Sequence, residues 1–290
     1  MDRSLLDSAL AEDIGSGDIT SRYFIPPGQR GRARIVARQR MVVSGLGPAR
    51  EVFSAIDAGV GVSVAVADGD ALESGGVILE AEGLVRSLLT AERIALNFLQ
   101  HLGGVATLTR RFVEAVAGTR AAILDTRKTL PGWRALEKAA VRHGGGLNHR
   151  MGLHDAVLVK DNHIAAARAA GLDLGAIVGR VRAENPGILV QFEADTLEQV
   201  QEFVGLGADA ILLDNMSLDE LRRAVALVGG RCRTEASGGV TLETVRSIAE
   251  TGVDLISIGA LTHSAPAADI SMELRGLPDE VRQTPCGPPD

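Results

Sequence analysis

The chain has 290 residues, of which 46% are hydrophobic and 23% are charged, a globular composition with enough material for one large or two smaller domains. Its formal net charge of −7 and its 3% of aromatic residues argue against a nucleic-acid-binding protein, because such proteins need a basic surface or stacking platforms. Two cysteines do not make a disulfide framework, and no apolar run reaches the roughly 18 residues of a membrane span, so we expect a cytoplasmic protein with no membrane partner.

The first part of the chain predicts a mixed α/β domain. Residues 2–13 have helical spacing, whereas residues 30–41, 60–66 and 77–85 have the pattern of short strands. Residues 88–105 then predict a long apolar helix with one narrow polar stripe.

The strand predicted over residues 30–41 carries arginines at even spacing, which places them on one face. We interpret this face as solvated or as a contact between subunits, since the negative net charge argues against a nucleic-acid site. The residues concerned are Arg30, Arg32, Arg34, Arg38 and Arg40.

From residue 121 onward, short apolar β segments alternate with helical stretches. This alternation predicts a parallel sheet, because a connection between parallel strands needs a crossover. Nearly every segment ends in polar or ionisable residues, and such groups converge on one site when the strands form a ring. We therefore expect an α/β fold whose second part is a barrel of about six parallel strands. The six segments are residues 121–127, 155–162, 187–194, 209–215, 233–239 and 254–261.

The lysines are confined to one stretch of the chain. Of the 30 lysines and arginines only Lys128, Lys138 and Lys160 are lysines, and all three lie within residues 125–163. A pocket lined by this basic stretch would suit a small, highly anionic substrate, because cations can orient carboxylates as well as attract them.

These basic residues occur in two different settings. Arg127, Lys128 and Lys160 follow predicted strands, Lys128 and Lys160 at the ends of adjacent ones, which favours a role in a site. Three further cations have helical spacing, and a solvated helix face explains them equally well. They are Arg134, Lys138 and Arg142.

Two glycine-bearing turns follow the last two predicted strands. They are Ser237-Gly238-Gly239 and Gly259-Ala260-Leu261, and His263 comes shortly after the second. Small residues at such turns let backbone N–H groups approach a phosphate, so this end of the site predicts a phosphate cradle. Neither a Walker loop nor a GxGxxG motif is present, which argues against an NTPase or a dinucleotide site.

Two acids, Glu193 and Asp214, end neighbouring strands of the otherwise basic site. Carboxylate oxygens beside a polyphosphate suit Mg²⁺, which takes one or two carboxylates together with phosphates and water. A salt bridge to a nearby Arg or Lys is the alternative, and both can hold, depending on whether substrate is bound. A pocket with a carboxylate end, a phosphate end and acids for a metal or a diol suits phosphoribosyl transfer.

Several motifs resemble, in the same order, those of the quinolinate phosphoribosyltransferase family, whose members are also called nicotinate-nucleotide pyrophosphorylases (carboxylating). The resemblance runs from about residue 15 to about residue 274. One departure is Gln191-Phe192-Glu193, where the family often has Glu-Val-Glu. The motifs are ERIALNFLQHLGGVAT (92–107), the segment from DTRKT to KDNHI (125–164), LLDNM (212–216), EASGG (235–239) and GALTHS (259–264).

This resemblance implies an architecture and a reaction. The architecture is an N-terminal α/β sandwich domain over residues 1–106, joined by residues 265–275, and a catalytic barrel over 107–264; we expect residues 276–290 to be a disordered tail. The reaction transfers phosphoribosyl from phosphoribosyl pyrophosphate to quinolinate with Mg²⁺, giving nicotinate mononucleotide, pyrophosphate and CO₂ in NAD biosynthesis. The resemblance also implies a homodimer or larger homo-oligomer with shared active sites.

The resemblance also assigns roles to individual residues. Glu193 and Asp214 would hold the metal, directly or through water. With Lys128 and Lys160 they are the expected catalytic residues. These four also bind substrate, and the partner subunit's Arg93 joins them. The other substrate-binding residues, all from the same subunit as the four, are Thr126, Arg127, His149, Arg150, Ser237, Gly238, Gly239, Gly259, Ala260, Leu261 and His263.

Three alternatives stay open. A relative associated with molybdenum transport shares the barrel, although such proteins generally lack the KDNH string found here at 160–163. A Schiff-base aldolase could use Lys160 at its strand end. A non-catalytic anion sensor would bind a ligand without turnover.

Overall fold

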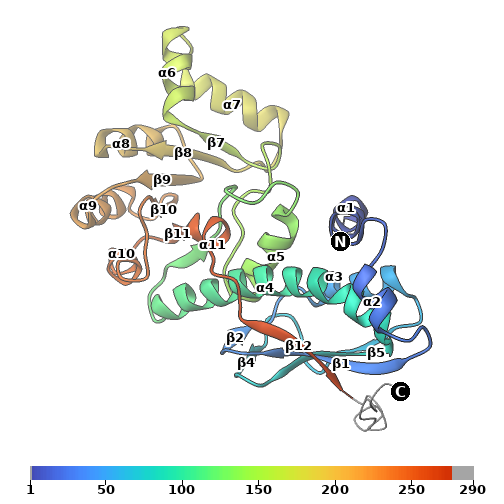
Figure 1. Cartoon of the computed structure of the whole chain (residues 1–290). Coiled ribbons are helices and arrows are strands. Elements are labelled where there is room, and N and C mark those ends of the chain that lie inside the picture. Colours follow the sequence, from blue (N-terminus) through green and yellow to red (C-terminus); the bar gives the residue numbers. More distant parts are fainter. Residues whose placement is uncertain (1, 276–290) are drawn as a thin grey trace, which may run out of the picture. The chain divides into compact units, whose positions relative to one another are not determined.

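The computed structural model describes residues 2–275, and they form two compact units (Figure 1). One unit comprises the chain up to Gly104 together with the chain from Ala267 onward, and the other is Val105–Pro266. The tail expected over residues 276–290 lies outside the described residues.

The first unit is built on a four-stranded antiparallel sheet in the order β12–β1–β5–β3. These strands are β1 (Arg30–Ala37), β3 (Gly61–Ser63), β5 (Val77–Leu84) and β12 (Ile270–Arg275), and a separate pair is formed by β2 (Met41–Val42) and β4 (Ala71–Leu72). Because β12 pairs with β1, the chain returns from the second unit to complete this sheet. The helices are α1 (Arg3–Ile14), α2 (Ile19–Phe24), α3 (Leu46–Ile56) and α4 (Val85–Ala115), which continues into the second unit. Helix α4 extends beyond the predicted 88–105 because apolar spacing continues to the buried Phe112.

The arginine face of β1 is solvated and paired with glutamates. Residues of β1 alternate between exposed and buried over its first half, and Arg32 and Arg34 lie on the exposed side. Their side chains form ion pairs with Glu82 at 2.9 Å and Glu80 at 2.6 Å on β5, while Arg38 pairs with Glu273 at 2.7 Å. The arginines and glutamates thus form a cross-strand charge ladder.

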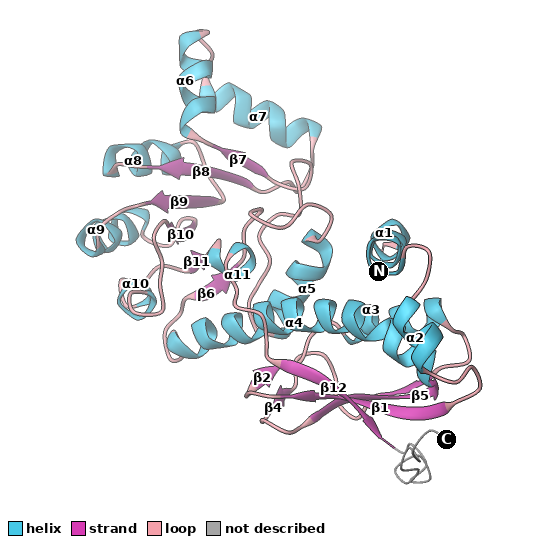
Figure 2. Ribbon diagram, in the orientation of Figure 1, coloured by secondary structure: helices cyan, strands magenta, loops and turns pink. Residues whose placement is uncertain are grey.

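The second unit is a six-stranded parallel sheet with helices between its strands (Figure 2). The strand order is β6–β11–β10–β9–β8–β7, so the predicted α/β class and the six parallel strands are confirmed. The strands are β6 (Ala122–Leu124), β7 (Val157–Val159), β8 (Val190–Ala194), β9 (Ala210–Asp214), β10 (Arg233–Ser237) and β11 (Leu255–Ser257). The helices are α5 (Arg134–His143), α6 (Asp161–Ala169), α7 (Leu174–Glu184), α8 (Leu197–Gly205), α9 (Leu218–Val228), α10 (Val245–Ala249) and α11 (Ala260–His263).

The strands before Lys128 and Lys160 are not hydrogen-bonded neighbours, contrary to our expectation. Strands β6 and β7 stand at opposite ends of the strand order, and the segment at Leu147 pairs with β6 instead, through a parallel bridge to Leu124. A single bridge is too short to show the period of a strand in the sequence, so this segment was not predicted.

Three consecutive glycines bring this segment to β6. A Cβ atom at Gly144 would lie 2.5 Å from the Ala106 carbonyl oxygen of α4, and one at Gly146 would lie 2.8 Å from the Thr109 side chain. Between them, Gly145 has a φ of +93°. Only glycine satisfies both the close packing and the turn. This triplet therefore sets the position from which the chain enters residues 147–150.

None of the helices within residues 2–275 is long and apolar enough to cross a bilayer.

Candidate active site

A single cavity of about 710 Å³ lies at the carboxyl ends of the parallel strands. Residues that end or follow all six strands contribute to its lining, including those of the two edge strands β6 and β7. Strands at opposite edges of a flat sheet could not share one cavity, so the sheet curves into a barrel. The contributing residues are Thr126, Arg127 and Lys128 after β6, Lys160 after β7, Glu193 on β8, Asp214 on β9, Ser237 on β10 and Gly259 after β11.

All of the predicted site residues line this cavity except two. Leu261 is fully buried in α11 and is not among the lining residues, so its assignment to substrate binding finds no support in its side chain. Arg93 lies exposed on α4 in the first unit, and it is not among the described residues that line the cavity.

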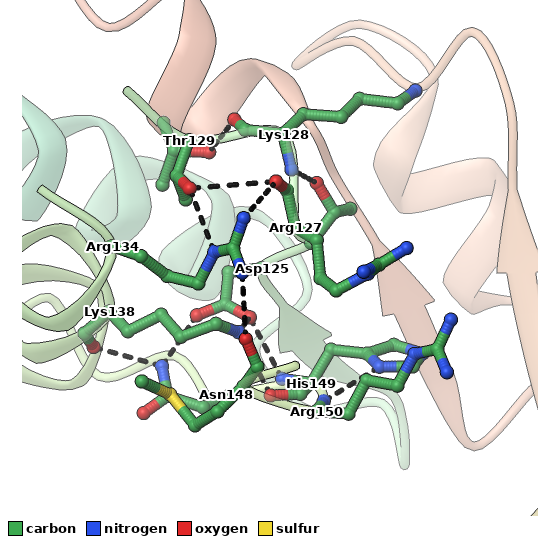
Figure 3. Close-up of polar contacts among 12 residues, drawn as sticks. Asp125, Arg127, Lys128, Thr129, Arg134, Lys138, Asn148, His149 and Arg150 are labelled. Atoms are coloured by element: carbon green, nitrogen blue, oxygen red, sulfur yellow. Dashed lines mark hydrogen bonds and ion pairs between the residues drawn. The ribbon is translucent and has the colours of Figure 1, made fainter. Parts of the chain in front are cut away.

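Cations gather at one end of the cavity. The side chains of Arg127, His149 and Arg150 extend toward the same side (Figure 3). Arg150 is held by its Nη1, which donates to the Ala156 carbonyl at 3.0 Å, and by its backbone N–H, which donates to His149 Nδ1 at 2.8 Å. Burial, with a further contribution from the charge of Arg127, lowers the pKa of Arg150. Two like charges held near each other favour a bound anion.

Lys160 stands at the start of helix α6, where the KDNH string has a structural function. The backbone N–H of Lys160 donates to His163 Nδ1 at 3.0 Å, which caps the helix. The Lys160 ammonium lies 2.7 Å from Glu193 Oε2, so the salt bridge foreseen as an alternative for Glu193 is present. The motif thus fixes a lysine beside an acid at the rim of the barrel.

Helix α5 does not present a simple solvated face of cations. Arg134 donates to Thr129 Oγ1 and to the Met151 carbonyl, each at 3.0 Å, and so ties together the two segments that carry Arg127 and Arg150 (Figure 3). Lys138 is fully buried, so a solvated helix face is wrong for this residue. Only Arg142 is exposed as that alternative predicts.

Lys138 forms a buried ion pair with Asp125, the last residue before the Thr126-Arg127-Lys128 segment. Both side chains have no exposed surface. Burial raises the pKa of Asp125, while the ammonium of Lys138 and N–H groups of His149 and Asn148 oppose the rise.

The end of the cavity where we predicted a phosphate cradle contains glycines in close contact with side chains. A Cβ atom at Gly238, where φ is +98°, would collide with the side chain of Asn215. A Cβ atom at Gly259 would lie 3.0 Å from the aliphatic chain of Lys128 and 3.1 Å from His263 Nε2. Both turns line the cavity, and the aliphatic chain of Lys128 lies against the second of them.

The acids lie on neighbouring strands, as predicted. Strand β8 pairs with β9 in parallel, and Asp214 Oδ2 accepts a hydrogen bond from Asn215 Nδ2 at 2.7 Å. Within residues 2–275 no group of three or more His, Cys, Asp and Glu side chains could hold a metal ion by itself. Glu193 and Asp214 could supply two oxygen ligands, and a bound polyphosphate would have to supply the rest.

Glu235 is a cavity residue that our residue assignment missed. Its side chain is 2% exposed, Oε2 accepts from Gln191 Nε2 at 2.8 Å, and Oε1 lies 3.6 Å from His149 Nε2. Side chains two residues apart on a strand share a face, so its position two residues before Ser237 could have indicated it. Gln191 stands where the family often has an acid. As an amide it donates a hydrogen bond to Glu235, whereas an ionised acid at this position would repel the Glu235 carboxylate.

An α/β barrel with cations, paired acids and glycine turns at its strand ends belongs to the class of anion-binding barrel enzymes. Residues 18–103 match the model of the quinolinate phosphoribosyl transferase N-terminal domain, and residues 105–273 match that of its C-terminal domain. The chain therefore belongs to the quinolinate phosphoribosyl transferase family.

Named relatives cover nearly the whole chain. It is 43% identical over 272 residues to the probable nicotinate-nucleotide pyrophosphorylase (carboxylating) of Bacillus subtilis, covering 94% of this chain and 93% of the relative. It is 43% identical over 280 residues to the Mycobacterium leprae nicotinate-nucleotide pyrophosphorylase (carboxylating), covering 94% and 96%. The solved structure of the Francisella tularensis nicotinate-nucleotide pyrophosphorylase has a TM-score of 0.87 at 37% identity, covering 94% of this chain and 95% of that one.

Proposed function

We propose that this chain is a quinolinate phosphoribosyltransferase (decarboxylating) of NAD biosynthesis. It transfers phosphoribosyl from phosphoribosyl pyrophosphate to quinolinate and releases pyrophosphate and CO₂. The observation that carries this proposal is the single cavity in which a cationic end, two strand-end acids and two glycine turns meet. These are the three parts that a dicarboxylate, a ribosyl centre and a phosphate require.

Quinolinate is a dianion with adjacent ring carboxylates, and the cationic end suits it. Arg127 and Arg150 can each pair with a carboxylate, and a guanidinium does so with two parallel hydrogen bonds. His149 and Lys160 lie in the same cavity and add further N–H donors. Because the arginines repel each other without an anion, a dianion gains by neutralising both.

The acids face the other substrate. Departure of pyrophosphate leaves positive charge on the ribosyl carbon, and preorganised carboxylates stabilise that charge as it develops. Glu193 and Asp214 are assigned this role, Lys128 neutralises the leaving pyrophosphate, and the turns at Gly238 and Gly259 receive the 5′-phosphate. Once the ring nitrogen carries the ribosyl group, the cationic ring accepts the electron pair of the 2-carboxylate as CO₂ leaves, and a proton takes its place.

The two acids also fit a Mg²⁺ ion brought in with the polyphosphate. Glu193 and Asp214 would hold it, directly or through water, because Mg²⁺ uses one or two carboxylates when phosphates complete its shell. When bound, the ion supplies positive charge to the pyrophosphate oxygens.

The aldolase alternative is not favoured by the geometry. Lys160 pairs with Glu193 at 2.7 Å, which suits an ammonium that binds anions, whereas a Schiff-base lysine reacts as a free amine. We propose a cytoplasmic location because the chain has only two cysteines and Cys232 is free, as is usual for proteins of a reducing compartment.

A turnover assay tests the function. Purified protein with quinolinate, phosphoribosyl pyrophosphate and Mg²⁺ is expected to release CO₂ and nicotinate mononucleotide in equal amounts. Product analysis by chromatography together with trapping of labelled CO₂ measures both. Absence of both products from folded protein would overturn the proposal.

We also propose a homodimer in which the partner subunit's Arg93 completes each site. An Arg93→Ala protein and an Arg127→Ala protein should each be nearly inactive. After subunit exchange, half of the dimers are mixed and one of their two sites is intact, so activity should return to about a quarter of wild type. Native mass spectrometry verifies exchange, and a verified mixture that stays inactive would refute sharing.

A further inference from the structure

Lys138, the one lysine outside the cavity lining, forms a buried ion pair directly behind the cationic end. Neither its side chain nor that of Asp125 has any exposed surface. A buried ion pair often stabilises a protein no more than apolar residues of the same volume do, so stability alone does not explain why this pair is present.

The contacts of the pair converge on the backbone of His149. Lys138 Nζ donates to Asp125 Oδ1 and also to the His149 carbonyl oxygen at 2.9 Å. The His149 backbone N–H in turn donates to Asp125 Oδ1 at 2.8 Å (Figure 3). Both polar backbone groups of His149 are thus held by the two members of the pair.

Asn148 reinforces the same arrangement. Its Nδ2 donates to Asp125 Oδ2 at 2.6 Å and to the Lys138 carbonyl at 2.9 Å. Every oxygen of the Asp125 carboxylate therefore receives an N–H donor from α5 or from the segment that follows it.

The pair joins the two chain segments that carry the quinolinate cations. Asp125 precedes Arg127 by two residues, and His149 is followed at once by Arg150. These segments are separated by helix α5 and carry like charges that repel each other. The buried pair holds them from behind the cavity, so that it leaves free the space that the substrate needs, and it adds to the hydrogen bonds of Arg134 to Thr129 and Met151.

We propose that Lys138 and Asp125 are positioning residues that set the spacing between Arg127 and the His149-Arg150 segment, and thereby the affinity for the dicarboxylate. This inference deepens the proposed function and rests on it. Neither side chain touches the substrate; each acts through the His149 backbone.

The test replaces both charges at once, by Asp125→Leu with Lys138→Met. Buried apolar residues of similar volume are tolerated where ion pairs stood, so the double variant is expected to fold. With the His149 backbone released, KM for quinolinate should rise at least about tenfold, whereas KM for phosphoribosyl pyrophosphate should change less than about twofold. An unchanged KM for quinolinate in the folded double variant would show a purely structural pair and overturn the proposal.

Two further variants keep the test decisive. Val141→Ala loosens the same helix at a fully buried residue. Val141 takes no part in the hydrogen bonds between Asp125, Lys138 and His149, so this variant should leave KM for quinolinate unchanged. An equal rise in this control would overturn the proposal in favour of general loosening. Asn148→Ala, at a half-buried position, removes one donor to Asp125 without leaving a lone charge. We expect KM for quinolinate to rise about threefold in this variant. No rise would contradict the proposal, even if the double variant failed to fold. Wild-type turnover in the same assay separates these outcomes from failure of the proposed function.

Discussion

Replacing Arg127 by methionine is expected to lower kcat/KM for quinolinate by about 100- to 1000-fold. Removing one partner of a charge pair in a desolvated site costs about 2–5 kcal/mol, and each 1.4 kcal/mol is about tenfold. Methionine keeps the aliphatic volume, so the loss reports the guanidinium. The effect should appear mainly in KM for quinolinate, because Arg127 lies at the cationic end of the cavity beside Arg150. Steady-state kinetics with each substrate varied in turn measures it.

Arg180→Met provides the matched control. Arg180 is an exposed residue of α7 whose ion pair with Glu184 spans 3.9 Å, and it does not line the cavity. This variant should keep wild-type kinetics. If Arg127→Met raised both KM values equally, Arg127 would not be a specific ligand of quinolinate.

Glu193→Gln and Asp214→Asn are each expected to lower kcat by about 100- to 1000-fold while KM for quinolinate changes little. Removing one group that stabilises charge in a transition state costs about that much. The amides keep the shape of the side chains but remove the negative charge that faces the developing ribosyl cation. Single-turnover kinetics, which isolates the chemical step from product release, checks this result.

Glu202→Gln on α8 is the corresponding control, because Glu202 pairs with Arg168 on the surface and lies outside the cavity lining. It should leave kcat unchanged. A rise in KM for quinolinate with unchanged kcat in Glu193→Gln would instead make this acid a partner that only orients Lys160, from which it lies 2.7 Å away.

The strands and their polar ends could be predicted because both signals are local. Each apolar run shows its own period, and its last residues carry the chemistry, so Lys160, Glu193 and Asp214 were placed correctly at strand ends. The arginine face of β1 was predicted as a face for the same reason, since alternation needs no knowledge of the partner strand.

Lys138 and Glu235 needed contacts that no local pattern contains. Lys138 has the same helical spacing as Arg134 and Arg142, and only the packing of α5 against Asp125 and His149 distinguishes it from a solvated cation. Glu235 depends on two strands and a loop at once, because Gln191 on β8 and His149 after α5 approach it from different parts of the chain.

Backbone approach also escaped the sequence patterns. The segment at Leu147 joins β6 through a single bridge, which the glycine triplet before it makes possible. Leu261 was assigned to substrate binding as part of a predicted glycine-bearing turn, but it lies in helix α11, which places this side chain in the core.

The turnover assay run with quinolinate and nicotinate side by side tests the central claim most directly. The cavity holds cations for two carboxylates, and nicotinate lacks one of them, so it would leave a half-buried cation of the cavity unpaired. The predicted result is a kcat/KM for quinolinate at least about 1000-fold above that for nicotinate, with one CO₂ released for each mononucleotide. Equal use of the two pyridine acids would contradict it.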